Sequence, residues 1–329
     1  MMKRQVKIAF TGFPPYHDPH QQAYFRFLAD RYELVECDKP DFVIDGGQNF
    51  RHMRHEAVKI ELNSENLAPD FNLYDYAVGS TPLEFGERYV RIPWFAFSPH
   101  LAELDRRGEG SDGELLDRKF CSFVVSNAEF ADPLRRRFFE ALSRYKRVDA
   151  GGKYLNNVGA PVADKLAFCR GYKFNLAFEN SACPGYTTEK IVDAYAAHSL
   201  PVYYGNPEVE RDFRPESMIR VAGEADIERV VEEIVRLDRD DAAYLKAVRA
   251  PCLVESSGAV YEERLERFLA AILDQEPAAA RRRCPYGQQA VMQRHLKLVY
   301  GCDQFLRDFP GYNLAVGILG RLRCRRRGL

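Results

Sequence analysis

The sequence lacks the features that identify several common classes of protein. No apolar run approaches the roughly 18 residues that a membrane-spanning helix requires, and the N-terminal apolar stretch is broken by charge and then by Pro14-Pro15, so we expect no signal peptide. The eight cysteines are scattered without a Cys-x-x-Cys pair, which argues against a zinc site and against a disulfide scaffold. We therefore expect free thiols in a reducing cytoplasm.

Motifs for several kinds of catalysis are also missing. The chain has no P-loop, no Gly-x-Ser-x-Gly and no histidine cluster, so phosphotransfer, serine hydrolysis and zinc chemistry lack their usual signatures. Gly108-Glu-Gly-Ser-Asp-Gly113 matches the dinucleotide-binding string, but it follows a charged helical stretch and carries two acids where a pyrophosphate would lie. We interpret it as a flexible loop, which argues against a dehydrogenase. Asp238-Arg-Asp240 is interpreted as an exposed turn between helices and not as a metal-binding pair.

The residues that are present are typical of a globular protein with two domains. Of the 329 residues, 46% are apolar and 29% are charged, which is ordinary for such a protein, and this length favours two domains over a single core. The net charge of −1 conceals an asymmetry, because residues 281–329 contain eleven Lys or Arg and two Asp, a net +9, which leaves −10 for residues 1–280. An acidic body therefore ends in a basic segment.

Short apolar segments alternate with helical ones in both halves of the chain. We predict strands at 6–10, 41–45, 57–62 and 74–78 with a helix at 21–31, then strands at 120–125, 173–178 and 201–204 with helices that begin at Asp132-Pro133 and span 187–197, 227–237, 241–248 and 260–273. This order indicates an α/β protein whose parallel sheets are covered on both faces. We predict two Rossmann-like domains that face a cleft.

We place the domain boundaries at residues 117 and 275. Residues 1–117 and 118–275 form the two domains, separated near the end of a charged, Gly-rich stretch at 101–118. Residues 276–329 form a basic, partly amphipathic tail, in which Arg281-Arg-Arg and Arg325-Arg-Arg bracket apolar segments at 296–300 and 314–319. Such a pattern is typical of contact with an anionic membrane surface, and a solvated tail is the alternative.

The most informative segment runs from Phe174 to Lys190. An alternating strand leads into a polar loop, and the loop opens a helix, which is the local geometry that presents backbone N–H groups and side chains to an anionic ligand. Asn180 and Tyr186 lie in the loop, and Glu189 and Lys190 lie in the first helical turn. This combination indicates a sugar-nucleotide site.

A second strand-to-helix connection carries Arg135 in its first helical turn. Three adjacent arginines cannot all face one direction on a helix, so one of them can face a ligand while the others are solvated. Arg135 and Lys190 together would neutralise a diphosphate without a metal ion.

A candidate general base lies in the first half, in the acidic stretch Glu61-Leu-Asn-Ser-Glu-Asn66. This stretch follows a predicted strand, and a carboxylate at the C-terminal end of a parallel strand points into the crevice where ligands bind. Glu65 is the candidate base, and Glu61 is the local competitor. An exposed acidic loop without a catalytic role is the alternative interpretation.

Taken together, these residues resemble the α1,3/α1,4-fucosyltransferases of glycosyltransferase family 10, in particular the bacterial members. The similarity is strong from residue 120 to about 213 and weaker at 64–93, and it covers about residues 57–275. The matching segments are 174–178, Glu179-Asn-Ser181, Gly185-Tyr186, Thr188-Glu-Lys190 and 201–207, and more loosely 64–66, 71–76 and 87–93.

The resemblance implies a GT-B architecture, with an N-terminal acceptor domain, a C-terminal donor domain and GDP-β-L-fucose in the cleft. It implies that Glu65 is the catalytic base, that Arg135 and Lys190 hold the diphosphate, and that Asn180, Tyr186 and Glu189 line the donor pocket. Glu189 is also a catalytic candidate, as the carboxylate that stabilises an oxocarbenium-like sugar. The membrane anchor of animal members and the heptad repeats of some bacterial members have no counterpart in this sequence.

The implied activity is that of an inverting fucosyltransferase, which moves L-fucose from GDP-β-L-fucose to a hydroxyl, O3 of GlcNAc, of a LacNAc-type glycan on a glycolipid or lipopolysaccharide. We expect no required cofactor and no metal site, with stimulation by Mn²⁺ or Mg²⁺ left open, and no nucleic-acid partner. We expect a cytoplasmic protein whose basic tail contacts the inner face of the cytoplasmic membrane. Two alternatives stay open: a GT-B glycosyltransferase that uses another nucleotide sugar, and a non-catalytic protein of the same fold that binds nucleotide or glycan.

Overall fold

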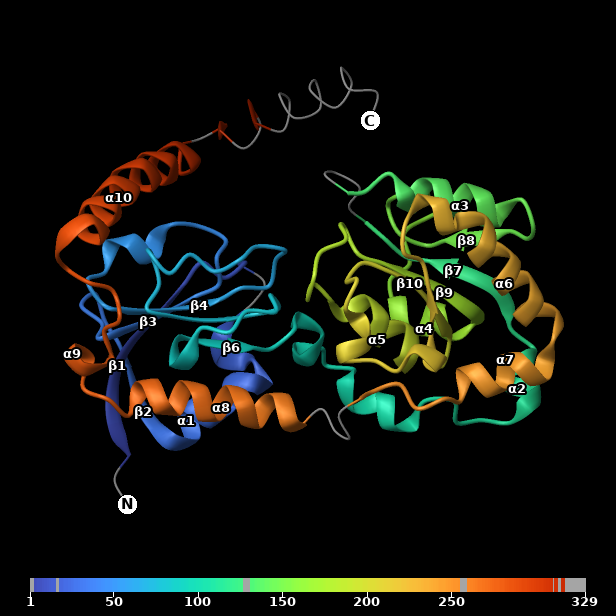
Figure 1. The fold of residues 1–329 in the computed structure, drawn as a ribbon, viewed down its shortest axis with the longest axis horizontal. Coiled ribbons are helices and arrows are strands. Elements are labelled where there is room, and N and C mark those ends of the chain that lie inside the picture. Colours follow the sequence, from blue (N-terminus) through green and yellow to red (C-terminus); the bar gives the residue numbers. More distant parts are fainter. Residues whose placement is uncertain are drawn as a thin grey trace. The chain divides into compact units, whose positions relative to one another are not determined.

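The computed structural model describes residues 3–15, 18–126, 131–254, 259–309, 311–312 and 315–316. It divides the chain into two compact units. The first consists of Met1–Gly79, Leu83–Ile92 and Glu262–Leu329, and the second of Ser80–Pro82 and Pro93–Tyr261. Each unit contains a parallel sheet of its own (Figure 1).

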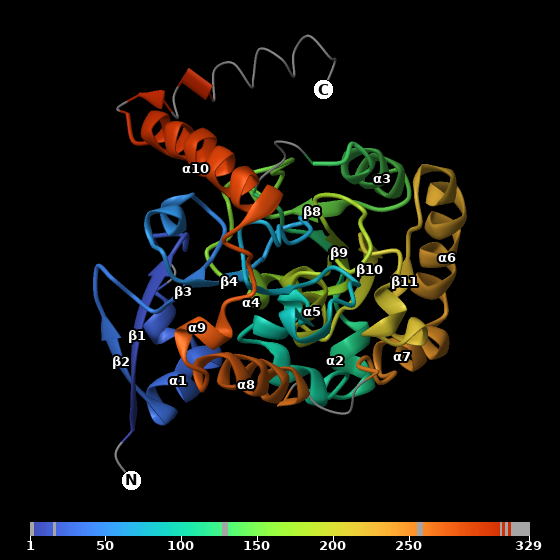
Figure 2. The same cartoon turned by 60° about the vertical axis from the view of Figure 1, so that its left-hand side comes forward.

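The first unit is built on a six-stranded parallel sheet in the order β2-β1-β3-β4-β5-β6. The strands are β1 Arg4–Thr11, β2 Tyr32–Glu36, β3 Phe42–Asp45, β4 Val58–Leu62, β5 Tyr76–Gly79 and β6 Tyr89–Arg91. Every residue of β3, β4 and β5 is buried, as expected of parallel strands covered on both faces. Helices α1 (Arg26–Arg31) and α8 (Ala259–Leu273) lie on one face, and α10 (Gly287–Arg307) lies on the other (Figures 1 and 2).

The second unit is built on a five-stranded parallel sheet in the order β11-β10-β9-β7-β8. The strands are β7 Lys119–Phe123, β8 Val148–Ala150, β9 Tyr172–Phe178, β10 Leu200–Tyr204 and β11 Ile219–Arg220; the helices are α2 Asp112–Leu116, α3 Leu134–Ser143, α4 Lys165–Arg170, α5 Glu189–Ala196, α6 Ile227–Arg239 and α7 Asp241–Val248. The core includes the rings of Phe138 on α3 and Phe178 on β9, whose centroids lie 5.1 Å apart. Helix α5 packs against β9 and β10.

The two sheets share one strand order. In each, the first strand in the chain lies between the second and the third, which creates a topological switch point beside that first strand. In the second unit this point lies between β7 and β9. Ligands of open α/β sheets bind at the carboxyl ends of the strands beside such a point, so the loop after β9 is the first candidate for a site. The predicted α/β class with two Rossmann-like domains is confirmed, whereas the cleft between them stays a prediction.

The unit boundaries differ from the domain boundaries that we predicted, because residues 93–117 lie in the second unit. Phe95 packs there against Phe213, with ring centroids 4.7 Å apart. Arg107 donates to the carbonyl oxygens of Ser217 at 2.7 Å and Ala247 at 3.1 Å. The charged stretch near residue 101 is therefore attached to the second core and does not separate two domains.

The C-terminal part of the chain returns to the first unit instead of forming a separate tail. At the end of α8, the Asp274 carboxylate accepts hydrogen bonds from Tyr32 Oη at 2.8 Å and from Arg31 Nη2 at 2.6 Å. After the short helix α9 (Pro277–Ala280), α10 stacks Tyr300 on Phe50 at a centroid distance of 4.1 Å. The predicted basic cluster at 325–327 and most of the apolar segment at 314–319 lie outside the described residues.

Several predicted elements agree closely with the structure, and others were missed. The strands predicted at 57–62 and 173–178 are β4 and β9, and the helix predicted at 241–248 is α7. In place of the helix predicted at 21–31, the structure has a 3₁₀ turn at Ala23–Phe25 followed by α1. The missed elements are β2, β6, β8, β11, α2, α4, α9 and α10. Three of these strands have only two or three residues, too few to show an apolar period.

One buried carboxylate joins the returning chain to the first sheet. Asp75 directly precedes β5 and is 0% exposed. It accepts the backbone N–H groups of Lys59 at 2.8 Å, Arg282 at 2.9 Å and Arg283 at 2.9 Å. It also forms an ion pair of 3.0 Å with the Arg283 side chain, which is 9% exposed. Three distant parts of the sequence therefore depend on one side chain.

We expect Asp75→Ala to lower the free energy of unfolding by about 3–5 kcal/mol, because it leaves Arg283 as a buried charge without its partner. Urea unfolding followed by circular dichroism measures this loss. Glu87→Ala is the matched control, since Glu87 pairs with the neighbouring Arg282 but its side chain is 69% exposed; its cost should stay below about 1 kcal/mol. Equal losses in the two variants would contradict this account of Asp75.

Candidate active site

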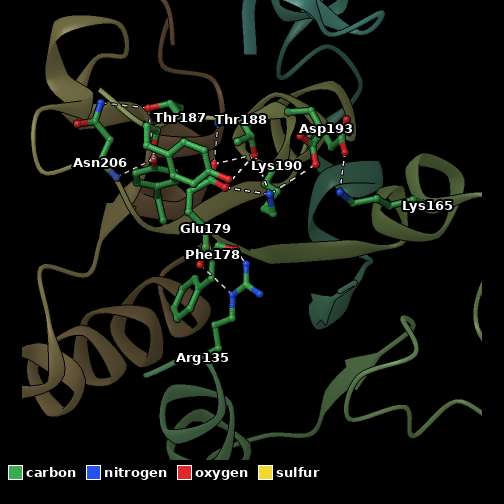
Figure 3. A network of polar contacts seen from close by, with 12 residues as sticks. Arg135, Lys165, Phe178, Glu179, Thr187, Thr188, Lys190, Asp193 and Asn206 are labelled. Atoms are coloured by element: carbon green, nitrogen blue, oxygen red, sulfur yellow. Dashed lines mark hydrogen bonds and ion pairs between the residues drawn. The ribbon is translucent and has the colours of Figure 1, made fainter. Parts of the chain in front are cut away.

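The loop between β9 and α5 is organised around the buried carboxylate of Glu179. Glu179 directly follows β9 and is 0% exposed. Its Oε1 accepts the backbone N–H of Thr188 at 2.7 Å, and its Oε2 accepts from Thr188 Oγ1 at 2.8 Å and from Lys190 Nζ at 2.9 Å (Figure 3). Buried carboxylates must be paired or hydrogen-bonded. These bonds therefore tie the end of the strand to the first turn of the helix.

Lys190 is charged and keeps some exposure to solvent although it pairs with Glu179. Its Nζ also donates to Thr188 Oγ1 at 2.8 Å and lies 3.6 Å from Glu189 Oε1. Burial opposes the charged form, but Glu179 and Glu189 outweigh that effect and raise the pKa of Lys190, so the ammonium stays charged. An ammonium has three donors, of which two are used in these hydrogen bonds. The side chain is 18% exposed, so it keeps some contact with solvent.

Arg135 holds the strand end that carries Glu179. Its side chain lies in the first turn of α3 and is 1% exposed. Nε donates to the carbonyl oxygen of Glu179 at 2.9 Å, and Nη2 donates to that of Phe178 at 2.6 Å. These bonds satisfy backbone acceptors at the end of the strand. The structure thus brings Arg135 and Lys190 to the same residue, as Figure 3 shows, and the role of Arg135 in binding a diphosphate stays a prediction.

The middle of the loop is fixed from the neighbouring strand β10. Asn206, just after β10, accepts the N–H of Gly185 at 2.8 Å and donates to Thr187 Oγ1 at 3.1 Å. Gly185 has φ +84°, and a Cβ there would lie 2.0 Å from the carbonyl oxygen of Ser80. Only glycine fits this position without a backbone shift. The loop is therefore held at both of its ends and in its middle.

The remaining predicted donor-site residues lie on the same loop. Tyr186 is buried, whereas Asn180 is partly exposed and its carbonyl accepts the N–H of Asp132 at 2.8 Å. Glu189 is the first residue of α5, and its side chain is 42% exposed. Burial works against its charge, but Lys190 lowers the pKa of Glu189, which keeps the carboxylate ionised. The structure thus gathers the five predicted residues of the second half around one loop.

The two candidate bases lie in the first unit, in different environments. Glu65 is exposed in the loop after β4, where its N–H donates to Asn63 Oδ1 at 2.8 Å. Glu61 lies within β4 and is 8% exposed, and its Oε2 has no hydrogen-bond partner among the described residues. Burial, Asp45 and Asp70 raise the pKa of Glu61 to about 8. At neutral pH, Glu61 must first lose a proton before it can act as a base.

Neither a cluster of metal ligands nor a membrane-spanning helix occurs among the described residues. Over the ranges that the structure describes, no group of three or more His, Cys, Asp or Glu side chains is arranged to hold a metal ion, and metal independence stays a prediction. In the same ranges, no helix combines the length and the apolar character that crossing a bilayer requires. The seven cysteines that the structure describes are free.

Glu179 and Asn206 were not predicted as site residues, although both belong to segments that match the family. The available signal was their position, since Glu179 directly follows β9 and Asn206 lies two residues after β10, at strand ends where ligand-binding groups of α/β sheets occur. The sequence did not indicate that both side chains turn to the same loop. That convergence depends on β9 and β10 being neighbours in the sheet.

Comparisons with known proteins identify the family. Residues 8–98 match the model of the α-(1,3)-fucosyltransferase FucT N-terminal domain, and residues 117–249 match that of the glycosyltransferase family 10 (fucosyltransferase) C-terminal domain. The chain carries both domains of a family 10 glycosyltransferase. The predicted resemblance is confirmed, and the loop around Glu179 lies in the C-terminal family 10 domain.

Individual relatives agree with this assignment. The α-(1,3)-fucosyltransferase FucT of Helicobacter pylori is 34% identical over 221 residues, which are 57% of this chain and 46% of that one. Human 3-galactosyl-N-acetylglucosaminide 4-α-L-fucosyltransferase FUT3 is 34% identical over 137 residues, 40% of this chain and 36% of that one. The chain thus matches less than half the length of these relatives. The crystal structure of an α1,3-fucosyltransferase with GDP-fucose superposes with a TM-score of 0.71 at 28% identity, covering 84% of this chain and 92% of that one.

We expect Glu179→Gln to lower the free energy of unfolding by roughly 2–4 kcal/mol, because it removes the charged acceptor of Thr188 and Lys190 at a buried position. Thermal and urea unfolding measure the loss. Glu189→Gln is the matched control, since its exposed side chain should contribute less than about 1 kcal/mol. A Glu179→Gln variant as stable as this control would show that the loop does not depend on the buried carboxylate.

Proposed function

We propose that this protein is an inverting fucosyltransferase that transfers L-fucose from GDP-β-L-fucose to O3 of GlcNAc in a LacNAc-type glycan. The observation that carries the proposal is the charged loop between β9 and α5, where Lys190 is held beside a helix N-terminus within the family 10 C-terminal domain. The similar α1,3-fucosyltransferase crystallised with GDP-fucose supports GDP-fucose as the donor.

The departing GDP develops negative charge, which the loop is suited to stabilise. Lys190 contributes its remaining donor, and the N-terminus of α5 contributes the positive end of its dipole. Arg135 adds a second positive charge at the end of β9. Glu179 and Glu189 offset these cations, so the proposed stabilisation comes from where the donors are placed and not from an excess of positive charge. We propose that no metal is required, and adding Mn²⁺ or Mg²⁺ to the assay tests for stimulation.

Inversion in a single displacement requires a base and a stabilised sugar cation. Glu65 is proposed to accept the proton of the attacking hydroxyl, a transfer that typically contributes about 10²–10⁴-fold in rate. The ionised carboxylate of Glu189 is proposed to stabilise the oxocarbenium-like transition state or to bind the donor ribose. Asn180 and Tyr186 are proposed to line the donor pocket. The fucose then leaves its β-linked donor and becomes α-linked in the product.

The acceptor is proposed to be carried by a glycolipid or lipopolysaccharide, with this cytoplasmic protein at the inner face of the cytoplasmic membrane. Large apolar side chains on α10 support a peripheral contact, since Leu298 is 67% exposed and Phe305 is 65% exposed. Basic residues in the same C-terminal part would add attraction to anionic lipid.

The decisive experiment is incubation of the purified protein with GDP-fucose and LacNAc without added metal. Released GDP and the mass and linkage of the product are followed together. A fucosylated product supports the proposal, and its linkage distinguishes 1,3 from 1,4 transfer. Turnover only with GDP-mannose or a UDP-sugar indicates another glycosyltransferase, and GDP binding without any turnover indicates a non-catalytic binding protein.

We expect Lys190→Ala and Arg135→Ala each to weaken GDP binding by about 10- to 100-fold, the range for losing a hydrogen bond to a charged group. Isothermal titration calorimetry with GDP measures the change. Arg136→Ala is the matched control, because Arg136 lies next to Arg135 but pairs with Glu140 on the helix surface. Unchanged GDP affinity in both variants would exclude these residues from the diphosphate site.

We expect Glu65→Gln to keep GDP affinity but to lose turnover by at least about 100-fold, as removal of a general base requires. Glu61→Gln distinguishes the alternative. If Glu61 is the base, kcat/KM of the wild type falls as the pH drops below about 8, because its carboxyl then becomes protonated. Kinetics from pH 6 to 9 measure both effects. Turnover of Glu65→Gln within a few-fold of wild type would exclude Glu65 as the base.

A further inference from the structure

A basic cavity of about 240 Å³ lies in the first unit, whereas the loop around Glu179 belongs to the second. Its charged lining residues are Glu56, Lys59, Arg281, Arg283, Arg294 and Lys297, five cations and one carboxylate. They come from the region of β4 and from the segment between α9 and the middle of α10. The volume is below the roughly 300–1,000 Å³ of sites for drug-sized ligands, so the cavity fits a small group.

Lys59 is the buried cation of this cavity. It lies on β4 and is 5% exposed. Its Nζ has no hydrogen bond or ion pair among the described residues; the bonds to Asp75 involve only the backbone N–H and carbonyl of Lys59. Burial and the nearby Arg283 lower the pKa of Lys59 to about 8. A charged ammonium is costly to bury without a partner. An anion in the cavity would supply that partner to Lys59.

Two further donors in the cavity also lack acceptors. The Nε2 atom of Gln293 is buried and has no hydrogen-bond partner among the described residues. The exposed guanidinium of Arg294, one residue along α10, makes no hydrogen bond or ion pair to the described part of the chain. By contrast, Arg283 is paired with Asp75, and Lys297 donates to Glu56 at 2.8 Å. The cavity therefore offers an ammonium, an amide and a guanidinium for which the described residues supply no acceptor.

We propose that this cavity binds a phosphate group, with Lys59, Gln293 and Arg294 as its donors. A phosphate supplies several strong acceptor oxygens and nearly two negative charges at neutral pH, which matches three unpaired donors and an excess of positive charge. A carboxylate would offer less charge and only two oxygens. The group belongs either to a soluble phosphorylated compound or to a phospholipid headgroup, and this site is independent of the proposed donor loop.

Titration of the full-length protein with inorganic phosphate tests the site by calorimetry. We expect Lys59→Met and Arg294→Ala each to weaken phosphate binding at least tenfold. Arg294 is exposed and unpaired among the described residues, so Arg294→Ala should fold normally and its result stands even if Lys59→Met does not fold. Arg26→Ala is the matched control, an exposed arginine on α1 outside the cavity, and should bind phosphate like the wild type.

The donor loop is another place where phosphate can bind, so Lys190→Ala serves as a second control. Binding that persists in Lys190→Ala and is lost in Arg294→Ala supports the cavity. Absence of phosphate binding to the wild type, or equal affinity of wild type and Arg294→Ala, would overturn the proposal.

Vesicle sedimentation distinguishes the two sources of phosphate. Vesicles of phosphatidylcholine with phosphatidic acid are compared with vesicles of phosphatidylcholine alone. Sedimentation with phosphatidic acid that Arg294→Ala loses and inorganic phosphate competes away identifies a lipid headgroup. Phosphate binding in the titration without such sedimentation identifies a soluble phosphorylated compound.

Discussion

The buried carboxylate of Glu179 determines the conformation of the loop that carries the proposed donor site. A charge without contact to solvent must be neutralised locally, and here Thr188 and Lys190 do so from the first turn of α5. Arg135 fixes the backbone of Glu179 from α3. The ammonium of Lys190 is thereby positioned before a nucleotide binds, which avoids the cost of ordering a long flexible side chain on binding. Preorganised charge of this kind is what stabilises a leaving group most effectively.

The first unit uses buried carboxylates for a different purpose. Asp75 holds together β4, β5 and the segment after α9 through backbone and side-chain donors. Glu61 contrasts with it, since one of its oxygens has no partner in the part of the chain that the structure describes and its pKa is raised to about 8. An acid that is kept protonated by burial costs less to bury than a carboxylate. The two buried acids therefore differ in their surroundings. Asp75 is an ionised, structural carboxylate because hydrogen-bond donors surround it, whereas Glu61 is kept protonated because few donors do.

Because the C-terminal part of the chain packs on the first unit, several of its basic side chains have defined partners there and do not belong to a free tail. In the sequence, residues 281–283 are part of a basic tail suited to a membrane surface. In the structure, Arg283 is nearly buried against Asp75, and Arg294 and Lys297 line a cavity with Lys59. Part of the charge is therefore concentrated at a defined place in the first unit. Helix α10, which carries Arg294 and Lys297, also carries exposed apolar side chains such as Leu298.

The sequence alone determined the fold class, the two Rossmann-like domains, the family and the loop that carries Lys190, because these depend on local apolar periods and on a long, specific motif. The tertiary structure decided the boundaries of the units, the partners of Glu179 and the surroundings of Lys59. Residues 93–117 join the second unit through Phe95, and α8 joins the first through Asp274, contacts between residues far apart in the chain. Such contacts follow from strand order and packing, which no local pattern specifies.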